Sequence, residues 1–114
     1  MLTLAEELLL LAIKDEKGSI RMSASTALEY SLGGAILLEL AIQEQISIDG
    51  KYIIDVPNSH AIEDPLLNQA RLLIEDTPKR KKAIYWVQKF PGTLQLKKKL
   101  LDRLHQKGVV AKNK

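Results

Sequence analysis

The residue types that most often carry catalysis or bind metal are scarce in this chain. It contains two histidines, His60 and His105, and no cysteine. The two histidines are not spaced as a metal-binding pair. Aspartate and serine occur, but no motif brings them together with a histidine as in a nucleophilic triad. We therefore predict no catalytic residue, no metal site, no cofactor and no enzymatic activity.

The residues whose side-chain chemistry most clearly suggests binding are basic, and they form two clusters. The first cluster, residues 79–82, comes shortly before Tyr85 and Trp86. Basic residues followed by an amphipathic aromatic side chain are typical of a segment at a membrane surface. The predicted membrane-surface residues are Lys79, Arg80, Lys81, Lys82 and Trp86. The alternative interpretation is an ordinary solvated helix face.

The second cluster, Lys97-Lys98-Lys99, lies early in an amphipathic helix. At about 100° per residue, the leucines at positions 94, 96, 100, 101 and 104 form one apolar arc. Lys97 falls inside that arc, whereas Lys98 and Lys99 fall outside it. A lysine on an apolar face extends its ammonium group to solvent, pairs with an acid or lines a pocket. For Lys97 the sequence leaves all three open.

The charges divide the chain into two parts. Residues 1–76 carry five lysines and arginines against 13 acidic residues, whereas residues 77–114 carry 12 against one. This asymmetry indicates either a basic surface for an anionic partner or two halves that attract each other. Charge alone is a weak membrane anchor, because four lysines contribute about 4 kcal/mol, which corresponds to millimolar affinity. A headgroup pocket, an inserted apolar residue or oligomerisation must add to it.

The elements that position these clusters are predicted to be mainly helical. A length of 114 residues fits one domain, 1–114. Thr3 and Glu6 form a capping box that begins the first helix, and a second helix continues to about Gln43. Asp49-Gly50 predicts a hairpin over 46–54. Helices are then predicted to begin at Asp64-Pro65, at Thr77-Pro78 and at Thr93, the last one ending before Gly108. We expect about five helices in a compact bundle with one or two small β-hairpins.

Two adjacent glycines, Gly33 and Gly34, stand in the middle of the second predicted helix. Each costs about 0.5–1 kcal/mol relative to alanine in a helix interior. They lack the spacing and the Lys-Ser/Thr of a phosphate-binding loop. Close packing against another backbone is the favoured interpretation, with a kink or a ligand as the alternatives.

Blocks spread along the chain resemble the Golgi phosphoprotein 3 family. They are Leu2–Leu11 followed by Lys14–Gly18, then Leu32–Ala41, the hairpin with Ile46 and Ile48, and Leu100–Val110. The family domain is about twice this length, so the chain resembles its N-terminal half or a truncated relative. The resemblance implies a non-enzymatic helical domain that binds phosphatidylinositol 4-phosphate at a membrane surface.

The resemblance also implies which positions would hold the headgroup. Lys97 matches one of two basic residues at the start of the family's last helix, and Leu94 stands at the other. Gly33 stands where the family has an arginine. A family tryptophan matches about Ala24, near which Arg21 is the only cation. The implied phosphoinositide-binding residues are therefore Lys97, Arg21 and Gly33.

Two other functions stay open. The basic C-terminal helix followed by Lys107-Gly108-Val109-Val110 resembles the recognition helix and wing of a nucleic-acid-binding winged helix, although the first two blocks make nucleic acid an unlikely partner. The second is a protein-interaction module, whose partner is another protein or a second copy of this chain in a homo-oligomer.

No apolar run approaches the roughly 18–20 residues of a membrane span, and the acidic start is unlike a signal peptide. We expect a cytoplasmic protein, peripheral at a membrane surface.

Overall fold

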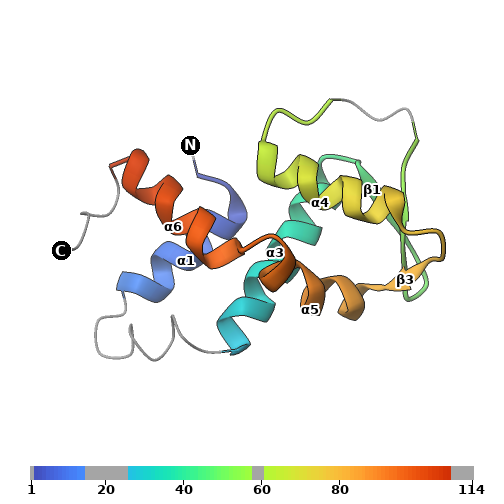
Figure 1. The fold of residues 1–114 in the computed structure, drawn as a ribbon, viewed down its shortest axis with the longest axis horizontal. Coiled ribbons are helices and arrows are strands. Elements are labelled where there is room, and N and C mark those ends of the chain that lie inside the picture. The colour runs from blue at the N-terminus through green and yellow to red at the C-terminus, as the bar shows by residue number, and fades with distance from the viewer. Residues whose placement is uncertain (1, 15–25, 58–60, 109–114) are drawn as a thin grey trace.

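The computed structural model describes residues 2–14, 26–57 and 61–108. These residues form helix α1 (Leu4–Lys14), helix α3 (Thr26–Ile42), strands β1 (Ile46–Asp49) and β2 (Tyr52–Asp55), helix α4 (Pro65–Asp76), strand β3 (Lys81–Lys82), helix α5 (Ala83–Thr93) and helix α6 (Leu96–Gln106) (Figure 1). The described part is thus mainly helical, with five helices and one small sheet. This confirms the predicted fold class.

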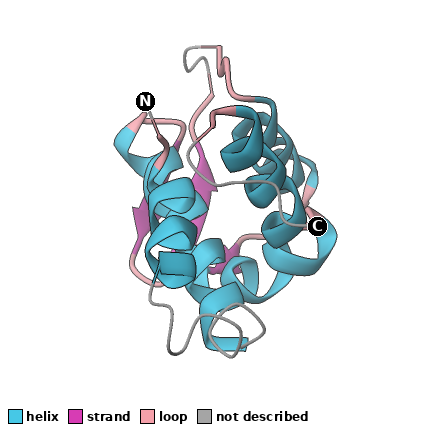
Figure 2. Cartoon of the chain, turned by 90° about the vertical axis from the view of Figure 1, so that its left-hand side faces the viewer, coloured by secondary structure: helices cyan, strands magenta, loops and turns pink. Residues whose placement is uncertain are grey.

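Helix α3 is the central element, and it packs against α1, α4, α5 and α6. It can do so because apolar residues lie on all its sides, as expected for a helix surrounded by others. The core is built mainly from leucines, together with Trp86 and Phe90 from α5. In Figure 2 the small sheet lies behind the helices nearest to the viewer. The strands contact α3, α4 and α5.

Three helix boundaries follow local sequence signals. The Thr3 amide donates to Glu6 Oε1 at 2.7 Å, and the Glu6 amide donates to Thr3 Oγ1 at 3.2 Å. This is the predicted capping box of α1. Asp64 caps α4, accepting hydrogen bonds from the amides of Leu66 and Leu67, and Pro65 is the first residue of that helix. Gly108 follows α6 with a φ of 75°, a conformation that favours glycine.

The sheet has three antiparallel strands in the order β1-β2-β3. Asp49 pairs with Tyr52, so the hairpin turn consists of Gly50 and Lys51. The prediction had placed Asp49 in the turn, one residue too early. Gly50 has a φ of 63°, the conformation for which a glycine is needed there. The third strand, Lys81–Lys82, pairs with Ile53 and Tyr52 and was not predicted.

Two predicted helix starts are wrong. Thr77 ends α4, and its hydroxyl donates to the Leu73 carbonyl at 2.7 Å. Helix α5 begins only at Ala83, because residues 81 and 82 pair with β2 first. Thr93 belongs to α5, and α6 begins after Gln95, whose φ of 51° turns the chain. Sheet pairing and this left-handed residue thus overrode the local capping signals.

Candidate functional site

The first basic cluster lies at the edge of the sheet. Lys79 and Arg80 occupy the connection between α4 and β3, and Lys81 and Lys82 form β3 itself. Lys79, Arg80 and Lys82 are exposed, and Lys81 is half-buried. The cluster was expected at the start of a helix, and the structure places it on an edge strand. Lysines are common on such edges because their charge discourages pairing with another chain.

Trp86 does not accompany these lysines at the surface. Its side chain is only 1% exposed, and its ring stacks on Phe90 with centroids 5.4 Å apart. Tyr85 meets it edge-on at 4.9 Å. The prediction that Trp86 contacts a membrane surface is therefore wrong. The indole of Trp86 faces the core, where it packs against apolar side chains, whereas the indole of an interfacial helix lies at the surface.

A cavity of about 170 Å³ lies beside the basic cluster. Its walls come from β2, the end of α4 and residues 77–81, and Trp86 contributes to its lining. Lys79, Arg80 and Lys81 all line it, together with the carboxylates of Asp55 and Glu75. The cluster therefore borders a recess in which cationic and aromatic groups meet.

Two of the three residues implied as a phosphoinositide site, Gly33 and Lys97, lie within the described residues. A methyl group added to Gly33 would lie 2.5 Å from the carbonyl oxygen of Val87. Because there is no space even for a methyl group, a headgroup cannot bind at Gly33. Close helix packing, the favoured interpretation of the glycine pair, is confirmed at this position. Lys97 is half-buried on α6, and Arg21 lies outside the described residues.

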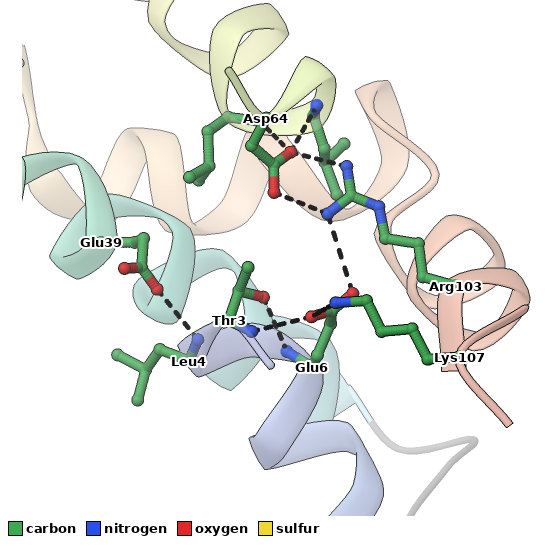
Figure 3. A network of polar contacts seen from close by, with 9 residues as sticks. Thr3, Leu4, Glu6, Glu39, Asp64, Arg103 and Lys107 are labelled. Atoms are coloured by element: carbon green, nitrogen blue, oxygen red, sulfur yellow. Dashed lines mark hydrogen bonds and ion pairs between the residues drawn. The ribbon is translucent and has the colours of Figure 1, made fainter. Parts of the chain in front are cut away.

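The most extensive polar contacts join the two ends of the chain (Figure 3). Glu6 is fully buried, and Lys107 Nζ lies 2.7 Å from its Oε1. Arg103 Nη1 lies 3.9 Å from its Oε2. A buried carboxylate is costly unless cations and donors compensate it. Lys107 and the amide of Thr3 bind Oε1, whereas Oε2 has only the more distant Arg103 and no hydrogen bond within the described residues. These contacts connect the end of α6 to the start of α1.

Arg103 also binds the cap of α4. Its Nη1 donates to Asp64 Oδ2 at 2.8 Å and its Nη2 to Oδ1 at 2.6 Å, a bidentate pair. Burial by itself would raise the pKa of Asp64. The hydrogen bonds from Arg103 and from the amides of Leu67 and Leu66 outweigh burial and lower that pKa. The hydrogen bond to Asp64 in turn raises the pKa of Arg103.

Glu39 has a role that its position in the sequence did not reveal. Its Oε1 accepts a hydrogen bond from the amide of Leu4 at 2.9 Å (Figure 3). In sequence it interrupts an apolar run in the middle of a helix. In the fold it satisfies an amide at the first turn of α1 that would otherwise have no partner within its helix. A lone acid among apolar helix residues is the signal that could have indicated such a contact.

These contacts explain part of the charge asymmetry. Arg103 and Lys107 pair with Asp64 and Glu6, and Arg80 Nη1 pairs with Asp49 Oδ2 at 3.0 Å. Each of these pairs joins the basic half to the acidic half. Attraction between the halves is therefore one use of the charge. The lysines at 79 and 82 remain exposed, so a basic surface persists as well.

The structure gives little information on the remaining residues discussed in the sequence analysis. Within the described ranges, no three side chains are grouped as metal ligands, and none of the helices is long and apolar enough to cross a membrane. His105 is half-buried on α6. His60 lies outside the described residues. So do Val109 and Val110, on which the winged-helix interpretation depends.

Comparison with known proteins gives one assignment. No curated protein matches the chain, and no solved structure does. The profile described as Golgi phosphoprotein 3 (GPP34) matches residues 4–114, which is nearly the whole chain. That match agrees with the blocks recognised in the sequence and with the helical fold. The chain belongs to the Golgi phosphoprotein 3 (GPP34) family.

Proposed function

We propose that this protein is a non-enzymatic, peripheral membrane-binding module. It recognises the headgroup of an anionic phospholipid, phosphatidylinositol 4-phosphate. The observation that carries the proposal is membership of the Golgi phosphoprotein 3 family over residues 4–114. The family's printed name also supports an association with the Golgi. The exposed lysines at the sheet edge supply the charge that an anionic leaflet attracts.

Lys97 is the residue through which headgroup recognition is tested best. It matches a basic position of the family and lies, half-buried, in the first turn of α6. A half-buried ammonium group recognises a phosphate more selectively than an exposed one, because less water competes for it. Lys98, the next residue, is exposed and provides a matched control on the same helix.

Flotation with liposomes tests the proposal. Wild type, Lys97→Ala and Lys98→Ala are mixed with vesicles containing phosphatidylinositol 4-phosphate or with phosphatidylserine vesicles of equal charge. Each mixture is measured at low and at physiological salt. We expect the wild type to prefer the phosphoinositide at both salt concentrations, because a specific contact is screened less than surface charge. Lys97→Ala should lose that preference, and Lys98→Ala should keep it.

A third variant separates attraction by charge from recognition. Lys82→Ala removes an exposed cation of the sheet edge. It should weaken binding to both kinds of vesicle about fivefold at low salt, since one lysine contributes about 1 kcal/mol. Equal, salt-sensitive flotation of the wild type with both lipids would refute headgroup recognition. Circular dichroism of every variant checks that each is folded, and competition with duplex DNA tests the winged-helix alternative.

A further inference from the structure

The turn end of the β1-β2 hairpin carries large apolar side chains on both of its faces. Directly paired residues of an antiparallel sheet lie on the same face, and neighbours along a strand alternate between faces. Ile48 therefore shares a face with its partner Ile53, whereas Tyr52 lies on the opposite face. Ile48 is 63% exposed and Tyr52 is 40% exposed. A sheet that covers a core with one face usually has polar side chains on the other, so this end of the hairpin is unusually apolar.

The core of the protein ends before it reaches Ile48. Ile46, two residues earlier on the same face of β1, is 4% exposed, and Ile53 on β2 is 3% exposed. Both side chains belong to the hydrophobic core. Ile48 lies one step further towards the turn, where its side chain is left mainly to solvent. The hairpin therefore extends past the core and presents an aliphatic side chain that the fold itself does not use.

A third exposed apolar side chain flanks the same end of the hairpin. Ile84, in the first turn of α5, is 54% exposed. The Ala83 amide donates to the Lys51 carbonyl at 3.1 Å, so the start of α5 adjoins the hairpin turn. Strand β3, which leads into α5, lies at one end of the long axis of the molecule (Figure 1). We call Ile48, Tyr52 and Ile84 the hairpin tip; single exposed apolar residues are ordinary, but a group of three at one end indicates a contact surface.

The charges around the hairpin tip identify the partner. Residues 48–52 and 80–84 carry four cations against one acid, Asp49, and Arg80 Nη1 binds that acid at 3.0 Å. Lys51 in the turn and Lys82 on β3 are exposed. Aliphatic side chains next to exposed lysines and an amphipathic tyrosine suit the surface of an anionic bilayer. Nucleic acid would use the cations but would leave the two isoleucines in water.

We propose that the hairpin tip inserts into the surface of an anionic bilayer. Ile48 and Ile84 enter the boundary of the acyl chains, and the Tyr52 ring lies at the level of the headgroups. Lys51 and Lys82 extend their ammonium groups to the lipid phosphates. This inference rests on the proposed function, because it takes an anionic membrane as the partner. It adds the apolar contact that charge alone lacks, and it does not depend on Lys97.

A fluorescent label shows whether the tip enters the bilayer. The chain contains no cysteine, so a cysteine introduced at one position is the only one that reacts with the fluorophore NBD. Ile48→Cys places the label at the tip. Leu11→Cys places it on α1, where the native leucine is 67% exposed and thus a matched control. We expect the emission of the label at position 48 to shift to the blue with anionic vesicles, and that at position 11 to stay unchanged.

The full chain is mixed at low salt with vesicles containing phosphatidylserine, with phosphatidylinositol 4-phosphate vesicles of equal charge, or with neutral phosphatidylcholine vesicles. Sedimentation measures the bound fraction in each mixture, so that the emission of bound protein is compared. The neutral vesicles should bind least, because the lysines find no negative charge there.

A double variant tests whether the apolar side chains contribute to affinity. Ile48→Thr combined with Ile84→Gln keeps residue types that suit a strand and a helix. We expect it to bind phosphatidylserine vesicles about tenfold more weakly, because the apolar area withdrawn from the bilayer is about that of one isoleucine. Leu11→Gln should stay within about twofold of wild type, since α1 lies outside the contact. Circular dichroism checks that each variant is folded.

Several results would overturn insertion: no binding to either kind of anionic vesicle, bound protein whose label at position 48 stays in water, an equal shift at position 11, or a double variant that binds as wild type does. A label at position 48 that responds to duplex DNA and not to vesicles would assign this surface to nucleic acid instead. Lys97→Ala should lose the preference for the phosphoinositide and keep the blue shift. A blue shift without headgroup preference would therefore refute recognition alone, and headgroup preference without a blue shift would refute insertion alone.

Discussion

The adjacent glycines of α3 allow one substitution to be tested in two surroundings. A methyl group at Gly33 would lie 2.5 Å from the Val87 carbonyl oxygen, whereas one at Gly34 would have no atom within 4 Å. Alanine gains about 0.5–1 kcal/mol over glycine in a helix interior at either site. At Gly34 nothing opposes this gain. We therefore expect Gly34→Ala to raise the free energy of unfolding by that amount.

At Gly33 the same gain is opposed by a clash with backbone, which cannot be relieved by rotating a side chain. Helix α5 would have to move away from α3, and with it the buried rings of Trp86 and Phe90. Overpacking of this kind costs about 1–3 kcal/mol, and rigid backbone favours the upper end. We therefore expect Gly33→Ala to lower the free energy of unfolding by about 2 kcal/mol. The two variants should then differ by about 3 kcal/mol.

Urea denaturation followed by the fluorescence of Trp86 measures both values, with thermal unfolding as a second assay. A difference of about 3 kcal/mol corresponds to roughly 12 °C between the two midpoints. Each variant serves as the control for the other, since helix propensity changes equally in both. If Gly33→Ala were as stable as Gly34→Ala, the close approach of α3 and α5 would be refuted.

Arg103→Ala should lower the free energy of unfolding by about 2 kcal/mol, because it removes charge-assisted hydrogen bonds from a partly buried carboxylate; Arg80→Ala, which breaks an exposed pair, should cost less than about 1 kcal/mol in the same denaturation assay. Because folding lowers the pKa of Asp64, the ionised side chain stabilises the fold at pH values above its ordinary pKa of 3.8, and this stabilisation is lost as the pH falls further. Asp64→Asn should therefore make the free energy of unfolding less dependent on pH in this acidic range. Leu38 is 52% exposed on α3. We expect Leu38→Lys to shift any concentration-dependent oligomer towards monomer, as measured by light scattering. An unchanged mass distribution would contradict self-association through the exposed side of α3 at Leu38.

The sequence determined the features that depend on neighbours a few residues apart. The capping box of Thr3 and Glu6, the Asp64-Pro65 start of α4 and the glycine after α6 all lie where their patterns predicted. The arc of leucines on α6 likewise predicted its buried face, on which Leu96, Leu100 and Leu104 lie. Such signals are reliable because helix capping and amphipathicity are settled within one or two turns of chain.

Only the tertiary structure decided which residues face a partner and which face the core. Trp86 carries the same local signal whether it lies at a membrane or inside the protein, and its burial depends on α3 and α5 meeting. Gly33 and Gly34 are equivalent in sequence and differ only in what lies opposite them. Glu6 and Lys107 are 101 residues apart, so no local pattern could have joined them. Contacts between distant segments depend on how the whole chain packs, and they set both the buried ion pairs and the cavity beside the basic cluster.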